Sequence, residues 1–189
     1  MNGLQQEPMG ANVPQSVFDL FLLSLLDRGL QSPYDLLRQG GLSLGSTVPA
    51  LRRLEEAGLV RKKAPVGPSR RPRHWFQLSV AGRKLARGGW IPMLKDQPPS
   101  DFDAVLRVAD MAQYYQADRA DIAVFLKAAV SARQSPVRSG VLGSSETRDS
   151  LGIMATREAW DVTRLRAEAK FLDELAKSLR KRQAKSPKR

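Results

Sequence analysis

Apolar stretches and helix-breaking residues alternate along the first third of the chain. Apolar residues dominate positions 15–27 and cover so much of the helix circumference that both sides should be buried. Gly29 ends this helix, and Ser32 with Pro33 begins a second one that runs to Gly40. The pattern therefore predicts two short helices joined by a turn.

A third helix is predicted to follow the glycines at 40 and 41. Ser46 or Thr47 can cap it, and Pro49 then falls in the first turn, where its missing N–H costs nothing. Gly58 supplies a left-handed stop. Apolar residues recur at helical spacing along one side, at Ala50, Leu51, Leu54 and Ala57. Two helices joined by a glycine-containing turn, the second carrying hydroxyls and arginines, are typical of a helix-turn-helix.

The next stretch predicts a β-hairpin. Residues 59–64 and 74–78 resemble short strands, and the nine residues between them include three prolines and three arginines, Arg70, Arg71 and Arg73. Ser79 caps a further helix. Three helices and a basic hairpin form a winged helix, in which one helix enters the major groove of DNA while the hairpin, or wing, contacts phosphates or the minor groove.

The second half of the chain is predicted to be helical. A Pro-rich connector, 89–100, precedes helices at 101–115 and 118–133 and a long loop at 135–150. From Leu151, steps of four and three place apolar or small residues in a coiled-coil-like seam at positions 151, 155, 162, 165, 169, 172, 176 and 179. This seam requires a partner, which is either a helix of the same chain or the same region of a second subunit.

The net charge of +12 is concentrated in two segments. Residues 52–87 contain eleven Lys or Arg and two acids, and residues 177–189 contain seven basic residues and no acid. Because the remainder of the chain is mildly acidic, this distribution indicates a polyanion-binding surface. A solvated basic face with a solubilising tail is the simpler alternative.

The residues needed for most catalysis are missing. The chain has no Cys and a single histidine, His74, so thiol nucleophiles, Ser–His–acid chemistry and His-rich zinc sites have no basis. No phosphate-binding or dinucleotide fingerprint occurs. We expect a cytoplasmic protein that is not an enzyme, with no cofactor, no bound metal and no membrane association.

Three blocks of residues resemble the PadR family of bacterial winged-helix transcriptional regulators. They are LLSLLDRGLQSPYDLL (22–37), GSTVPALRRLEEAGLV (45–60) and RPRHWFQLSVAGRKL (71–85), with the spacing of the family. The resemblance covers about a third of the chain. Two positions depart from the family pattern, because Val48 replaces a Tyr that often contacts DNA and Pro33 replaces a Gly.

The resemblance implies dimerisation through the C-terminal helices. Together with the sequence patterns, this resemblance predicts a mainly α fold. An N-terminal winged helix-turn-helix with a short β-hairpin wing is followed by a C-terminal helical dimerisation region with a long last helix. The predicted parts are a flexible arm (1–14), a winged-helix domain (15–88), a connector (89–100), a helical dimerisation region (101–183) and a basic tail (184–189).

The function predicted on this basis is that of a PadR-like DNA-binding transcriptional regulator, a repressor that binds double-stranded DNA as a homodimer on a pseudo-palindromic operator. Base or phosphate contacts are expected from Ser46 and Thr47, and phosphate contacts from the arginines Arg52, Arg53, Arg70, Arg71 and Arg73. Trp90 and Trp160 are candidates for a pocket that binds a small-molecule effector. The alternative is a non-specific nucleic-acid-binding or architectural protein that uses the winged helix and the basic tail.

Overall fold

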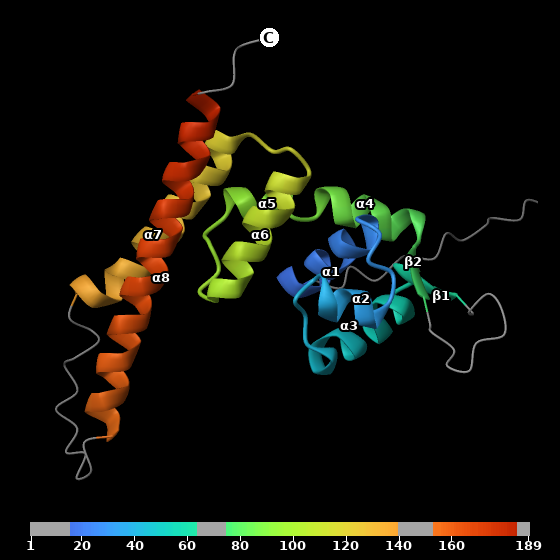
Figure 1. Ribbon diagram of the computed structural model, residues 1–189, viewed down its shortest axis with the longest axis horizontal. Coiled ribbons are helices and arrows are strands. Elements are labelled where there is room, and N and C mark those ends of the chain that lie inside the picture. The colour runs from blue at the N-terminus through green and yellow to red at the C-terminus, as the bar shows by residue number, and fades with distance from the viewer. Residues whose placement is uncertain (1–15, 64–74, 140–152, 185–189) are drawn as a thin grey trace, which may run out of the picture. The chain divides into compact units, whose positions relative to one another are not determined.

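The computed structural model describes residues 16–63, 75–139 and 153–184, and the chain divides into two compact units, Met1–Gly89 and Trp90–Arg189 (Figure 1). The predicted arm 1–14 lies outside the described residues, as do Arg70, Arg71 and Arg73 and most of the basic tail. The fold is mainly helical, as predicted, and the described residues contain a single two-stranded antiparallel sheet.

The first unit has the element order of a winged helix. Its elements are α1 (Val17–Asp27), α2 (Pro33–Arg38), α3 (Leu44–Glu56), β1 (Val60–Lys63), β2 (Trp75–Leu78) and α4 (Val80–Gly88). Its core is formed largely by leucines of the first three helices, including Leu22, Leu23, Leu36, Leu51 and Leu54. Burial of each such side chain contributes about 1.5–3 kcal/mol.

Serine caps set the helix starts in this unit. The prediction for α2 is confirmed, because Ser32 accepts from the Asp35 backbone, Asp35 accepts from the Ser32 backbone, and Pro33 occupies the first turn. The predicted stop of α3 is confirmed as well. Gly58 has a φ of +68°, and the N–H of Leu59 donates to the carbonyl of Leu54, so the helix closes with a Schellman arrangement.

The predicted cap of α3, Ser46 or Thr47, is wrong by three or four residues. Ser43, in extended conformation, is the N-cap, and its side chain accepts from the backbone N–H of Ser46. The helix therefore begins at Leu44, and Pro49 lies inside it rather than in its first turn. Because the helix begins earlier, Leu44 and Gly45 are also part of it.

The hairpin pairs β1 with β2 in the register Val60–Leu78, Arg61–Gln77, Lys62–Phe76 and Lys63–Trp75. Val60 and Phe76 are buried and anchor it to the helices. Gly82 of α4 lies directly against the backbone of Leu59, where a Cβ atom would stand 2.0 Å from the carbonyl oxygen. Only glycine permits α4 to approach the strand so closely.

The second unit consists of α5 (Ile91–Lys95), α6 (Phe102–Tyr114), α7 (Arg119–Arg138) and α8 (Ile153–Ala184). Asp101 and Asp118 cap α6 and α7, so both helices begin where the sequence predicted them. Two boundaries differ from the prediction. Part of the Pro-rich connector forms α5, and α7 continues through Pro136 into the predicted loop. Val137 lines a groove together with Leu165 of α8, so packing between these helices favours the extra turn.

The predicted seam of the last helix is partly satisfied within the chain. α7 and α8 pack against each other, and the buried seam residues are Ala169, Leu172, Ala176 and Leu179. Val162 and Leu165, nearer the start of α8, are only partly buried. This end of α8 extends past the end of α7 (Figure 1). An internal partner therefore accounts for the C-terminal half of the seam.

One buried arginine joins three segments of this unit. Arg133 of α7 is 3 % exposed, and its Nε donates to Glu168 of α8 at 2.8 Å. Its other nitrogens donate to the carbonyls of Ala129 and Ser100, and its guanidinium stacks over the Phe102 ring. Each nitrogen of the guanidinium thus donates at least one hydrogen bond, which offsets the cost of burying the charge.

Among the described residues, no helix combines the length and the apolar character needed to cross a bilayer.

Candidate nucleic-acid interface

One side of α3 is closed by the core and the other is open. Thr47, Ala50, Leu51 and Leu54 are buried, at the spacing of one helical face. The opposite side is exposed, and we call it the α3 outer face, made of Leu44, Val48, Pro49 and Arg52. Leu44 is 47 % and Val48 37 % exposed. A winged helix would present this side of α3 to a major groove.

The two hydroxyls predicted as contacts have different places. Ser46 is exposed, and its hydroxyl oxygen lies 2.8 Å from that of Ser43 and donates to the Ser43 carbonyl at 3.2 Å. Thr47 is fully buried, and its hydroxyl has no partner among the described residues. A side chain with no exposed surface cannot touch DNA in this conformation. Thr47 therefore belongs to the core side of α3.

The two predicted arginines of α3 also differ. Arg53 donates to Asp19 of α1 at 2.9 Å, and the carboxylate of Asp19 is largely buried. Arg53 therefore ties α3 to α1, although more than half of its side chain stays exposed. Arg52 is exposed and has no ion-pair partner among the described residues. Arg52 is the cation of α3 with the greater freedom to reach a phosphate.

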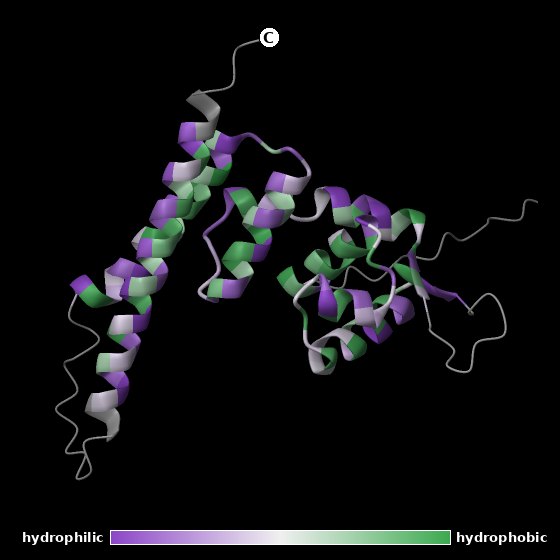
Figure 2. Cartoon of the chain, viewed as in Figure 1, coloured by the Kyte–Doolittle hydropathy of each residue, from purple (hydrophilic) through white to green (hydrophobic). Residues whose placement is uncertain are grey.

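The hairpin carries cations that were not named individually in the sequence-based prediction. Arg61, Lys62 and Lys63 are consecutive and exposed in β1, and the strand is correspondingly polar in Figure 2. Arg61 and Lys63 share a face of the hairpin with Gln77 and with Trp75, which is 44 % exposed. β1 packs on α3, so the strand that carries these charges is in direct contact with the helix that carries the α3 outer face.

A spacing rule would have corrected the prediction for α3. Thr47 stands three residues before Ala50 and seven before Leu54, which completes the buried i, i+3, i+4, i+7 pattern. Extending that pattern one turn earlier assigns Thr47 to the core and brings Val48 outward. No comparable signal concerns Arg70, Arg71 and Arg73, which lie outside the described residues and remain predicted phosphate contacts.

The two tryptophans proposed for an effector pocket lie in different surroundings. The Trp90 ring is buried and stacks on Tyr115 with ring centroids 6.2 Å apart, and Tyr115 in turn meets Tyr114 edge-on. Trp160 lies on α8 and is 65 % exposed. Their role in binding an effector stays a prediction.

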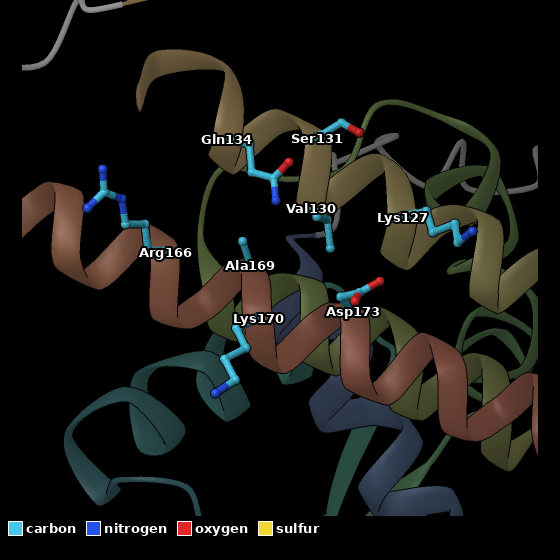
Figure 3. A pocket seen from close by; sticks show the side chains of 8 residues that line it. All are labelled: Lys127, Val130, Ser131, Gln134, Arg166, Ala169, Lys170 and Asp173. Atoms are coloured by element: carbon cyan, nitrogen blue, oxygen red, sulfur yellow. The ribbon is translucent and has the colours of Figure 1, made fainter. Parts of the chain in front are cut away.

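A groove of about 450 Å³ runs between α7 and α8 (Figure 3). Gln134 and Ala169 point toward each other across it, whereas the charged ends of Arg166 and Lys170 point away from it. Asp173, at its margin, pairs with Lys177, and this hydrogen bond raises the pKa of Lys177 above its ordinary value. Neither tryptophan lines this groove. Within the described segments, no three potential metal ligands come together.

No protein-family model matches the chain, and no curated protein matches it. Three solved structures are similar to it. PadR of Bacillus subtilis, solved with operator DNA, is 16 % identical with a TM-score of 0.39, over 86 % of this chain and 99 % of its own. The PadR-like regulator BC1756 of Bacillus cereus is 19 % identical with a TM-score of 0.35, over 94 % and 99 %. The protein smu.1604c of Streptococcus mutans is 17 % identical with a TM-score of 0.34, over 82 % and 96 %. Two of these three structures are named as PadR or PadR-like regulators.

Proposed function

We propose that this chain is a DNA-binding transcriptional regulator, a repressor that occludes a promoter. One observation carries the proposal. One face of α3 is buried in the core, its other face is exposed to solvent, and the same unit carries three consecutive exposed cations in β1. In a winged helix these are the two elements that meet DNA, α3 at the base edges and the hairpin at phosphates. Arg52, Arg61, Lys62 and Lys63 would supply the phosphate contacts.

The test is binding to a pool of random duplex DNA at two salt concentrations, followed by sequencing of the bound fraction. A regulator should enrich a twofold-symmetric site whose half-sites lie about one helical turn apart. Its affinity should fall steeply with salt because phosphate contacts release counterions. A protein that retains no duplex at low salt would contradict the proposal.

The wing is tested by Arg71→Ala combined with Arg73→Ala. If the hairpin tip contacts phosphates, this variant should bind all sequences more weakly, and the slope of log K against log salt should fall by about two. The site preference should stay unchanged, because phosphate contacts carry no base information. An unchanged salt slope would remove the tip from the interface.

We further propose that the regulator is a homodimer held by the N-terminal half of α8. The start of that half extends past α7 (Figure 1), and the half carries the exposed Trp160 and the partly buried Val162 and Leu165, of which Leu165 lies near Val137 in the last turn of α7. A coiled-coil-like contact with the same segment of a second copy would complete the seam. Sedimentation should give a dimer for the wild type and a monomer for Val162→Glu with Leu165→Glu. A wild-type monomer at micromolar concentration would contradict this part of the proposal.

The alternative is an architectural protein whose basic tail dominates binding. Leu179 is buried in the seam, so a deletion that begins at 177 would damage the fold along with the tail. The sharper variant removes only residues 185–189 and replaces the exposed Arg180 and Lys181 with Gln. A specific regulator should keep its site preference in this variant, whereas a tail-driven binder should lose most of its affinity.

A further inference from the structure

The N-terminal half of α3 exposes almost no group able to donate a hydrogen bond to a base. Between Leu44 and Leu51 the side chains are apolar except for two hydroxyls. That of Thr47 is buried, and that of Ser46 is engaged by Ser43. The side-chain pairings that identify guanine and adenine need Arg, Lys, Asn or Gln. This part of the helix has none of them.

The exposed surface there is apolar instead. Leu44, Val48, Arg52 and Glu56 are spaced by four residues and lie in a row along α3. The row begins with two aliphatic side chains, continues with a cation and ends with an acid. Pro49 adds further apolar surface beside Val48. In the major groove, the one apolar group that marks a base is the C5-methyl of thymine.

The charges near this row favour DNA as its occupant. The segment from Leu44 to Arg53 contains no acid, and both acids of α3 lie at its far end, at Glu55 and Glu56. Arg52 follows the apolar positions on α3, and β1, with its exposed cations, packs on the same helix. The start of α3 therefore presents no negative charge that would repel a polyanion. This is the end of a recognition helix that reaches base edges.

We infer that Leu44 and Val48 read thymine methyl groups in the major groove, so that the operator half-site is recognised through apolar contacts while Arg52 binds a phosphate. This inference rests on the proposed function. It makes Leu44 and Val48 the residues that determine specificity. Burial of one methyl group against these side chains is expected to change the affinity about fourfold.

The test replaces thymine by uracil in the duplex selected from the random pool. Uracil pairs with adenine and keeps the O4 acceptor, but it lacks the C5-methyl group. Wild-type protein should bind the uracil duplex about fourfold more weakly for each contacted thymine. Leu44→Ala with Val48→Ala should bind both duplexes equally and keep the wild-type salt slope, because its cations are unchanged.

Matched variants keep the result interpretable. Val80→Ala changes an exposed valine of α4, 91 % exposed, and should leave the thymine preference at its wild-type size. Val48→Ser alone should reduce the preference while retaining the Leu44 contribution, and circular dichroism checks that each variant is folded. Both altered residues of α3 lie outside the buried core of the unit, so their truncation leaves that core unchanged.

The possible results of this test distinguish a failure of methyl readout from a failure of the proposed DNA-binding function. Equal wild-type affinity for the two duplexes, or a duplex pool that binds without any enriched site, would overturn methyl readout while DNA binding stands. A full thymine preference in the double variant would assign the readout to other residues. Failure to bind any duplex would overturn the proposed function itself.

Discussion

In the unit Met1–Gly89 the described ion pairs place aspartates inside and arginines outside, whereas in the unit Trp90–Arg189 the deepest pair encloses the arginine. Asp19 pairs with the exposed Arg53, and Asp27 pairs with the exposed Arg83 and Arg87. Arg133, by contrast, is buried against Glu168. The ion pair of an exposed arginine is screened by water, so removing that arginine lowers the stability only slightly. A buried one leaves several groups without partners when it is removed.

The buried pair should give the largest loss on mutation. Arg133→Ala leaves Glu168 and the carbonyls of Ala129 and Ser100 without their donor. We expect the free energy of unfolding to fall by about 3–5 kcal/mol, measured by urea denaturation followed by circular dichroism. Arg138→Ala, on the same helix but exposed, is the control and should cost under about 0.5 kcal/mol. Equal losses in the two variants would contradict the special place of Arg133.

A replacement of the whole pair sharpens this comparison. Arg133→Met with Glu168→Leu removes both charges together, so no buried charge is left alone. Much of the stability lost in Arg133→Ala should return in this double variant. A loss as large as that of the single variant would show that Arg133 acts through Phe102 and the carbonyls of Ala129 and Ser100 rather than through its charge pair.

The next largest effect is the difference in stability loss between substitutions in the two halves of α8. Leu172 is fully buried against α7, and Leu172→Ala should cost about 2–5 kcal/mol of unfolding free energy. Leu165 is only partly buried, so Leu165→Ala should cost less in this measurement. If the proposed dimer forms, Leu165→Ala should instead raise its dissociation constant in sedimentation. A larger stability loss at Leu165 than at Leu172 would reverse the assignment of the two halves.

The sequence predicted the element types well because local signals marked them. The capping box at Ser32 and Asp35, the stop at Gly58 and the caps at Asp101 and Asp118 each involve residues within a few positions of one another. The start of α3 was missed because three hydroxyl residues compete for the cap. Ser43 has the role since it is the one whose helix places Thr47 and Ala50 together in the core.

The site was harder to predict because availability depends on distant partners. Nothing local distinguishes Arg52 from Arg53, and the difference between them is an aspartate that lies 34 residues away from Arg53. The seam of α8 posed the same difficulty. Its spacing showed that a partner was needed, but not that α7 covers only the half from Ala169 to Leu179.

The neighbouring arginines of α3 allow a direct comparison. Arg53→Ala removes the partner of the largely buried Asp19, so we expect a stability loss of about 1 kcal/mol. Arg52→Ala should leave the stability within about 0.5 kcal/mol. The effects on DNA should be reversed. Arg52→Ala should lower the salt slope of binding by about one, and Arg53→Ala should change it less. An identical pair of effects in both variants would remove the distinction.

The smallest predicted effect concerns Thr47, which is either a core residue of α3 or a contact to DNA. A buried hydroxyl without a partner is destabilising, and Thr47→Val replaces it with a methyl group in a site that already excludes water. We expect the free energy of unfolding to rise by about 1 kcal/mol and DNA affinity to stay unchanged. If Thr47 contacted DNA, as the sequence-based prediction held, the same substitution would weaken binding without stabilising the fold. Urea denaturation together with a duplex titration distinguishes the two cases.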